Sequence, residues 1–192
     1  MLKRYFVVIA ALALFAGTAI SATSYNVDTA HSNISFAVPI LGGTSKVTGK
    51  FTDFTVNVNY DEADITKSSV SAVIKATSID TGIERRDAHL RNPDFFDVEK
   101  YPEITFKSTR IEKKGKQMIA HGTFTMHGVS KEISFPFTIH TPPKDVTTPK
   151  PYVGFSARLS LNRQDYGVAY RNKNLPAFVG DNVDIQIDLI TR

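Results

Sequence analysis

The residues that could carry out chemistry are concentrated in one segment, Ser78 to Thr109, which interrupts two stretches of alternating apolar and polar residues. There, Arg85, Arg86 and Asp87 precede His89, so an imidazole that titrates near neutral pH lies close to guanidinium groups that pair with oxyanions. Such residues would suit acid–base catalysis or phosphate capture. No nucleophile accompanies them, however, and nearby aspartates are partners for the arginines, so a structural ion-pair cluster is the favoured interpretation.

The histidines and the missing cysteines limit the metal sites and the catalysis that are open to the chain. It has five histidines and no cysteine, and no histidine stands in a His-Glu-x-x-His arrangement. His121 and His127 would lie roughly 20 Å apart on an extended strand. No Gly-x-Ser-x-Gly elbow or phosphate-binding glycine loop is present. We therefore expect no metal, no cofactor and no catalytic residue, with an enzyme that uses His89 or His31 as its acid–base residue kept as the alternative.

The N-terminal 22 residues predict a signal peptide rather than a membrane anchor. Lys3 and Arg4 precede an apolar run that ends near Phe15, which is shorter than the roughly 20 residues of a membrane span, and small residues follow. Cleavage near residues 19–22 would leave one domain, 23–192, and would remove two of the 23 basic residues, so that the formal charge falls from +4 to +2. A nearly neutral, exported domain without disulfides suggests the periplasm and gives no basic surface for nucleic acid.

Alternating apolar and polar residues dominate the rest of the chain and predict about eight antiparallel strands with one polar face each. Such strands must form two packed sheets or close into a barrel. The alternation slips near Asp53, which indicates a bulge or a sharp bend, and Pro136 lies inside a strand pattern, which indicates an edge or an incomplete seam. A short helical segment is expected near residues 84–97, with two helical turns from Glu84 to Arg91.

The predicted inner faces mix large phenylalanines and isoleucines with small residues such as Ala72 and Gly122. Small inward residues could leave a hollow barrel that holds one small apolar ligand, or neighbouring aromatic rings could fill the space. The alternation alone leaves both interpretations open. The connection from Asp165 to Asp181 is longer than most, and loops of this length are often functional.

A series of ordered motifs resembles the YceI-like family of exported lipid-binding proteins over nearly all of the chain after the signal peptide. The motifs include Tyr25-Asn-Val-Asp28, His31-Ser32-x-Ile34-x-Phe36, Val47-x-Gly49-x-Phe51, Arg86-Asp87-x-His89-Leu90-Arg91, Asp94-Phe95-Phe96-Asp97, Tyr101-Pro102-x-Ile104-x-Phe106, Gly122-x-Phe124-Thr125-Met126-His127-Gly128 and Asn162-Arg163-x-Asp165-Tyr166-Gly167. The resemblance implies an all-β, antiparallel, lipocalin-like β-barrel whose lumen holds a polyisoprenoid lipid. An isoprenoid quinone such as ubiquinone, or a polyprenyl phosphate, would be the ligand, and a membrane b-type cytochrome is an implied partner.

The strand pattern then assigns the residues that would contact this lipid. Those expected to line the lumen share the apolar parity of their strands: Phe36, Val38, Val47, Phe51, Ala72, Ile74, Ile104, Phe106, Gly122, Phe124, Met126, Phe135, Phe137 and Phe155. Tyr166, Tyr170 and Arg171 in the long connection are the head-group candidates. The expected role is that of a periplasmic carrier or store. An enzyme acting on such a lipid and a stress-induced, non-catalytic adaptor with a filled barrel remain alternatives, and a homodimer is left open.

Overall fold

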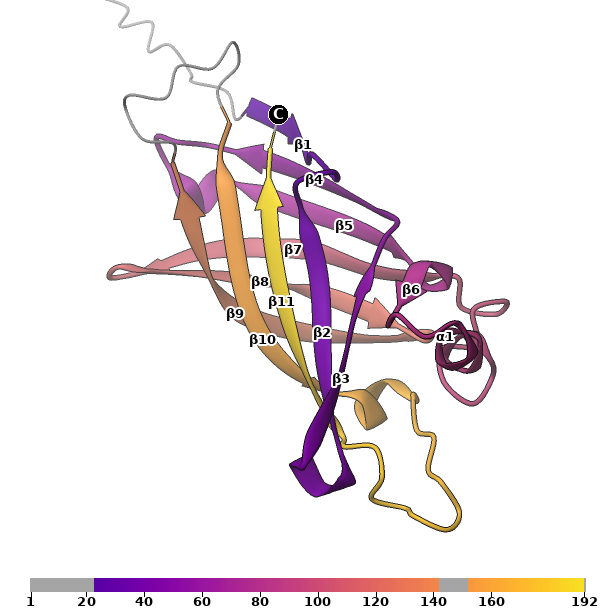
Figure 1. Cartoon of the computed structure of the whole chain (residues 1–192). Helices are drawn as coiled ribbons and strands as arrows, with labels where there is room; N and C mark the ends of the chain where they lie inside the picture. Colours follow the sequence, from indigo (N-terminus) through magenta and orange to yellow (C-terminus); the bar gives the residue numbers. More distant parts are fainter. Residues whose placement is uncertain (1–22, 142–151, 192) are drawn as a thin grey trace, which may run out of the picture.

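The residues that we describe in a computed structural model of the chain, 23–141 and 152–191, form one antiparallel sheet of eleven strands and a single α-helix (Figure 1). The strands are β1 (Thr23–Asn26), β2 (Asn33–Ile40), β3 (Ser45–Phe51), β4 (Phe54–Tyr60), β5 (Ser69–Lys75), β6 (Ile79–Asp80), β7 (Glu103–Lys114), β8 (Gln117–Met126), β9 (Val129–His140), β10 (Gly154–Asn162) and β11 (Asn182–Ile190). Their order across the sheet is β1-β4-β5-β7-β8-β9-β10-β11-β2-β3-β6. The predicted all-β, antiparallel class is confirmed. The predicted signal peptide lies outside the described residues.

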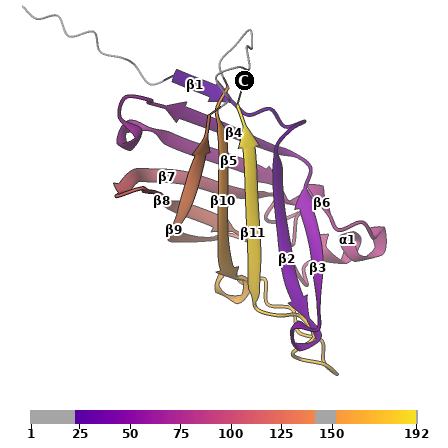
Figure 2. The same cartoon turned by 60° about the vertical axis from the view of Figure 1, so that its left-hand side comes forward.

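The sheet curls on itself, and its two halves face each other. Strands β4, β5, β7 and β8 run across the view behind β9, β10, β11, β2 and β3 (Figure 1), and the view turned by 60° shows the same crossing from the side (Figure 2). Short contacts add to the strand ladders near the two ends of the sheet. Val27 donates its N–H to Val56 O and forms a bridge with Thr191, and β6 pairs with the end of β3. The result is an open-sided barrel with one concave apolar face.

The strand count exceeds the predicted eight for local reasons. β1 and β6 are four and two residues long, which is too short for an alternating pattern to be visible. The slip near Asp53 is a break between two strands, because β3 ends at Phe51 and β4 begins at Phe54. Pro136 faces β8 on one side, while β9 pairs with β10 only over Phe137–His140, so the proline lies beyond the end of that ladder, as its missing N–H predicts.

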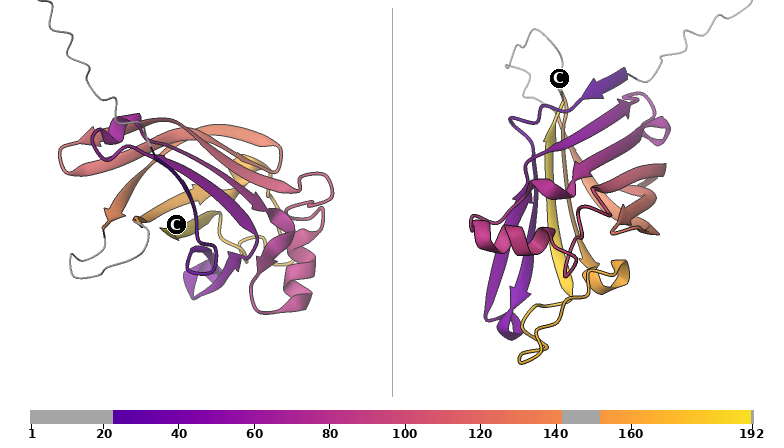
Figure 3. Two further views of the ribbon diagram at one scale, coloured as in Figure 1. Left: turned by 90° about the horizontal axis from the view of Figure 1, so that it is seen from above. Right: turned by 90° about the vertical axis from the view of Figure 1, so that its right-hand side faces the viewer.

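Helix α1 (Glu84–Arg91) lies beside β6 at one end of the curled sheet (Figure 3). Asp87 is buried near its start and accepts hydrogen bonds from the N–H and hydroxyl of Thr81, which fixes the entry of the chain into the helix. Arg91 donates to the carbonyls of Thr77 and Ile79, which ties the helix to the sheet. The helix has the bounds predicted for its two turns, Glu84–Arg91, and ends there because Pro93 disfavours a helical conformation at Asn92; the rest of the predicted segment near residues 84–97 forms turns. Within residues 23–141 and 152–191 no helix is long and apolar enough to cross a membrane.

Candidate functional site

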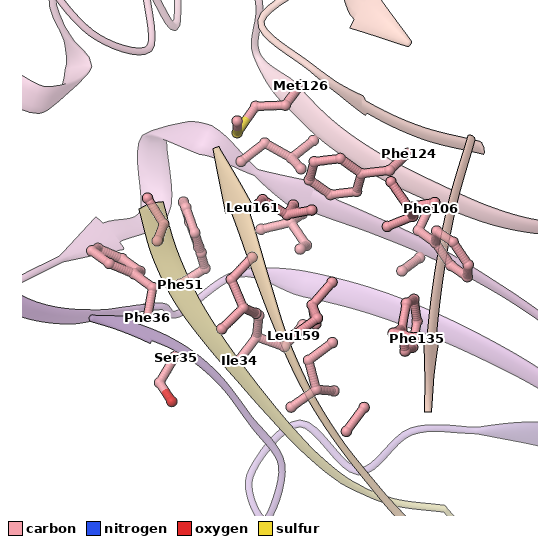
Figure 4. A pocket seen from close by; sticks show the side chains of 18 of the residues that line it. Ile34, Ser35, Phe36, Phe51, Phe106, Phe124, Met126, Phe135, Leu159 and Leu161 are labelled. Atoms are coloured by element: carbon pink, nitrogen blue, oxygen red, sulfur yellow. The ribbon is translucent and has the colours of Figure 1, made fainter. Parts of the chain in front are cut away.

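The concave face of the sheet encloses a cavity of about 440 Å³. Every strand except β1 contributes side chains to its lining, and α1 and the long connection after β10 close one end. Figure 4 shows how Phe36, Phe51, Phe106, Phe124 and Phe135 surround this space together with leucines of β10. The lining is overwhelmingly apolar, which suits a hydrocarbon ligand and offers few partners to water.

Thirteen of the fourteen residues predicted to line the lumen do line this cavity. They are Phe36, Val38, Val47, Phe51, Ala72, Ile74, Ile104, Phe106, Phe124, Met126, Phe135, Phe137 and Phe155. The period of two residues along each strand is sufficient to place them, because successive side chains of a strand point to opposite faces. Their contact with a lipid stays a prediction.

Gly122 is the exception, and it shows why small residues alone do not mark a cavity. A Cβ at Gly122 would lie 2.7 Å from Cζ of Phe106 and would also collide with the carbonyl oxygen of Lys107. Gly49 is similar, since a Cβ there would lie 2.5 Å from Cζ of Phe36. Both glycines are therefore covered by neighbouring aromatic rings. Ala72, in contrast, leaves room in the cavity.

Further lining residues show the same apolar alternation along their strands as the predicted ones but were not included in the prediction. They come mainly from β4, β10 and β11: Val56, Val58, Leu159, Leu161, Val183, Ile185, Ile187 and Leu189. Each follows the apolar parity of its strand. Extending the parity rule to every strand would have found them.

The end of the cavity next to α1 carries an arginine and a histidine. Arg86 lines the cavity there, and it donates from Nε to Thr81 Oγ1 and from Nη2 to Thr81 O, both at 2.7 Å. In residues 23–141 and 152–191 no carboxylate forms an ion pair with this guanidinium, so hydrogen-bonding capacity remains on its Nη1. His89 also lines the cavity, with Nε2 2.9 Å from Oδ2 of Asp94.

Aromatic rings complete this end. Tyr170 lines the cavity from the long connection, and its ring centroid lies 5.3 Å from that of His89 and 4.7 Å from that of Phe95. His89 and Phe95 are themselves 5.1 Å apart in an edge-to-face arrangement. These separations are typical of stacked and T-shaped pairs, so the cluster joins α1 to the long connection by side-chain packing.

Of the three predicted head-group residues, the structure places only Tyr170 on the cavity. Tyr166 is 2% exposed, packs edge-on against Phe124 and is absent from the lining, and burial raises the pKa of its hydroxyl. Arg171 is exposed and pairs with Asp181, with 3.2 Å between Nη2 and Oδ2. Arg86 and His89 line the cavity at the same end as Tyr170. Sequence reasoning treated them as an ion-pair cluster and missed them as cavity residues, because nothing in the alternation shows where α1 lies.

One buried arginine holds the long connection in place. Arg163 is 4% exposed and donates to the carbonyl oxygens of Val168 (2.6 Å), Gly180 (2.9 Å) and Val179 (3.2 Å). Its Nη2 also lies 3.3 Å from Oδ1 of Asp181. Burial lowers the pKa of this guanidinium, while the carboxylate of Asp181 opposes that shift. We call this set of contacts the Arg163 latch.

The other histidines of the described residues do not line the cavity. His31 pairs with Asp28 at the surface (2.7 Å), His121 with Glu112 (2.8 Å), and His140 with Ser156 (2.7 Å). His31, the second acid–base candidate, is therefore not positioned to act on a ligand in the cavity. His89 is the histidine of the described residues that lines it.

Comparison with known proteins gives consistent matches in sequence and in structure. Residues 25–191 match the sequence profile of the YceI-like domain. A UPF0312 protein of Vibrio parahaemolyticus is 39% identical over 137 residues, which are 70% of this chain and 72% of that protein. The crystal structure of BcnA from Burkholderia cenocepacia superposes with a TM-score of 0.77 at 24% identity, over 86% of this chain and 99% of BcnA. A polyisoprenoid-binding domain of Saccharophagus degradans, implicated in plant cell wall breakdown, gives a TM-score of 0.65 at 18% identity, over 88% and 97% of the two chains. The curled-sheet fold is common to all three structures.

Proposed function

The chain belongs to the YceI-like family, and from that premise we propose that it binds a polyisoprenoid lipid inside its cavity. The observation that carries the proposal is the lining itself, in which ten strands present apolar side chains to one continuous space. A Saccharophagus degradans domain with the same fold is described as polyisoprenoid-binding, which supports the same class of ligand. A long, branched hydrocarbon chain fits a lining that offers contact and almost no hydrogen bonds.

The energetics favour a carrier or a store that releases its lipid over a protein that binds it irreversibly. A chain of about 40 carbons would gain on the order of 30 kcal/mol on leaving water, at about 0.8 kcal/mol per carbon. That exceeds the practical limit of about 20 kcal/mol for non-covalent affinity. A lipid that comes from a bilayer already lies in hydrocarbon, so its transfer into the cavity is nearly neutral. Shape and head-group contacts then decide the affinity, and return to the bilayer stays easy.

The head group would lie at the polar end of the cavity, beside Arg86, His89 and Tyr170. The guanidinium of Arg86 can donate to a quinone carbonyl or pair with a phosphate, and the aromatic cluster with Phe95 offers a surface for a planar ring. An isoprenoid quinone such as ubiquinone and a polyprenyl phosphate are therefore the two head-group classes. An Arg86→Gln variant should weaken the binding of either lipid more than that of a polyprenyl alcohol of equal length.

The remaining parts of the proposal concern place and partner. The expected signal peptide leads us to propose a periplasmic protein that acts without catalysis, and a membrane b-type cytochrome is the partner to test. His89 is paired with Asp94 and packed between aromatic rings, a setting in which it can position a head group without transferring a proton. The cavity also speaks against an adaptor with a filled barrel.

Uptake of ubiquinone by the purified protein tests the proposal. The protein is incubated with ubiquinone in dilute detergent, separated from free lipid by gel filtration, and extracted with organic solvent so that the quinone can be quantified. We expect close to one quinone per chain, and competition by a polyprenyl phosphate. The absence of uptake for both lipids by folded, lipid-free protein would refute the binding function.

A further inference from the structure

The exposed large apolar side chains of the described residues belong to, or lie next to, α1 and the long connection, the elements that close one end of the cavity. Leu41 is 52% exposed, Ile83 53% and Leu175 54%. Leu41 belongs to the turn η1 (Leu41–Gly43) between β2 and β3, and Leu175 belongs to the long connection. Both loops lie together at the lower end of the molecule in Figure 1, and Leu41 N donates to Phe178 O at 2.9 Å. We call η1 and residues 171–178 the loop tip.

The backbone at Leu41 is held in an unfavourable conformation with its side chain in solvent. Leu41 has φ +51°, and Gly42 and Gly43 follow with φ +66° and +92°. A left-handed conformation is uncommon and unfavourable for a bulky residue, whereas glycine or asparagine would adopt it readily. The fold thus keeps a leucine at a position where the backbone conformation and the exposure to water are both unfavourable. A surface that covers Leu41 would offset the cost of exposing its side chain to water.

Two cations near the loop tip are left without an acidic partner. Asp181 pairs with Arg171, Asp184 pairs with Lys46, and Glu84 on α1 pairs with Arg91. Lys173 is exposed on the tip, and Arg85 is exposed on α1 next to Ile83. Neither forms an ion pair within the described part of the chain. Apolar side chains with unpaired cations beside them are suited to the interface of an anionic bilayer.

The loop tip is continuous with the cavity. Ile40, which precedes Leu41, lines the cavity, and so do Asn172 and Phe178 of the long connection. Tyr170 connects the same loop to α1 through its contacts with His89 and Phe95. A flat surface that contacts Leu41 and Leu175 would therefore lie against the end of the cavity where the head group is proposed to bind.

We propose that the loop tip docks reversibly on an anionic phospholipid bilayer, with Leu41 and Leu175 inserted among the head groups and Lys173, together with Arg85 of the adjoining helix α1, against lipid phosphates. The purpose of such docking, loading and unloading of the cavity, rests on the proposed function, but the docking itself does not require a lipid in the cavity. Two inserted leucines and two interfacial cations give weak, salt-sensitive attachment, in keeping with a protein that must leave the membrane again.

Sedimentation with vesicles tests the proposal on the lipid-free full domain. We expect binding to vesicles of phosphatidylcholine that contain phosphatidylglycerol, much weaker binding to pure phosphatidylcholine, and release by high salt. Leu41→Asn combined with Leu175→Asn should lower the apparent affinity at least about tenfold, and it should fold normally because asparagine suits the left-handed backbone of residue 41. Lys173→Glu with Arg85→Glu should lower it by a similar factor. The matched control, Lys113→Glu with Lys116→Glu in and beside the β7–β8 turn, makes the same change in net charge elsewhere and should bind more strongly than the tip variant.

Each outcome decides the proposal. No binding of the unaltered domain to anionic vesicles at low salt would overturn it, and so would binding that the loop-tip variants leave unchanged. Loss of a dimer in the leucine variant, measured by light scattering, without loss of vesicle binding would assign the loop tip to a second copy of the chain and overturn it as well. Uptake of ubiquinone from detergent should persist in the loop-tip variants. The two assays therefore separate the proposals. Vesicle binding can be absent while ubiquinone uptake is normal, and uptake can be absent while vesicle binding is normal.

Discussion

The wall of the cavity and the connection that closes one of its ends are held by different interactions. The wall consists of strands whose backbone groups pair with their neighbours, so its side chains contribute mainly apolar surface. The long connection has no such ladder, and Arg163 supplies hydrogen bonds to three of its carbonyl groups. Most lining side chains of the wall can therefore change with little effect on the fold, whereas loss of Arg163 would release several backbone groups of the connection at once. Ligand capacity and local stability should thus respond to different substitutions.

Arg163→Leu should give the largest loss of stability, and it tests whether Arg163 holds the long connection. It leaves the carbonyl oxygens of Val168, Val179 and Gly180 without the Arg163 donor and removes one of the three side chains that donate to the Asp181 carboxylate, so the free energy of unfolding should fall by about 3–5 kcal/mol. Chemical denaturation measures this loss. Arg171→Leu is the matched control, because it removes an exposed partner of the same aspartate and should cost at most about 1 kcal/mol. Equal losses in the two variants would show that the buried contacts of Arg163 are not what holds the connection.

Ala72→Phe tests the wall side. The added ring enters the cavity between Val56 and Phe106 on the neighbouring strands, and ubiquinone affinity should fall about 100-fold or more. The unfolding free energy should change by less than that of Arg163→Leu, because the cavity can receive the ring. Ser71→Phe adds the same ring on the outer face of β5 and should keep full affinity. Unchanged binding by Ala72→Phe would mean that the lipid does not occupy this part of the cavity.

Gly122→Ala tests a position of the wall that does not line the cavity, because Gly122 belongs to a cavity strand but is covered by the ring of Phe106. A methyl group there collides with the backbone of Lys107, so we expect a loss of stability of about 1–3 kcal/mol, measured by thermal or chemical denaturation. Gly154→Ala is milder, since its Cβ would meet Cβ of His140 at 3.2 Å. A fully stable Gly122→Ala protein would show that β8 can shift to make room.

The smallest effect concerns the acid sensitivity of the latch. A hydrogen bond from Gln164, with the charges of Arg171 and Arg163, holds the pKa of Asp181 below its ordinary value. A lowered carboxylate pKa in the folded protein gives stability that is present above the unfolded pKa of about 4 and is lost as the pH falls through the folded pKa. The stability difference between the unaltered chain and Asp181→Asn should therefore shrink between about pH 5 and pH 2. If this stability difference did not change with pH, the charge of the Asp181 carboxylate would not contribute to the Arg163 latch.

The two regions also differ in how well the sequence predicts them. Strand alternation placed Phe36, Phe106 and Phe135 on the cavity because a period of two residues follows directly from strand geometry. It failed at Gly122, since the position of the Phe106 ring above a glycine depends on side-chain rotamers and a cross-strand neighbour. Family resemblance, not periodicity, favoured a hollow interior.

The contacts that hold the long connection could not be predicted from the sequence, and the reason is physical. The bonds of Arg163 go to the carbonyls of Val168, Val179 and Gly180, groups that every residue type possesses, so no residue pattern announces them. In the same way, Arg86 and His89 were recognised as chemically interesting, but their position on the cavity depends on how α1 packs against β6. Tertiary contacts of this kind carry no local signal in the chain.

The most direct measurement is mass spectrometry of an organic extract of the protein after gentle purification from its native cells, with Ala72→Phe prepared in parallel. A polyisoprenoid lipid in near one-to-one amount with the unaltered protein, and greatly reduced in the variant, is the predicted result. An unaltered protein that yields no polyisoprenoid, and that takes up neither added ubiquinone nor polyprenyl phosphate, would contradict the binding of such a lipid in this cavity.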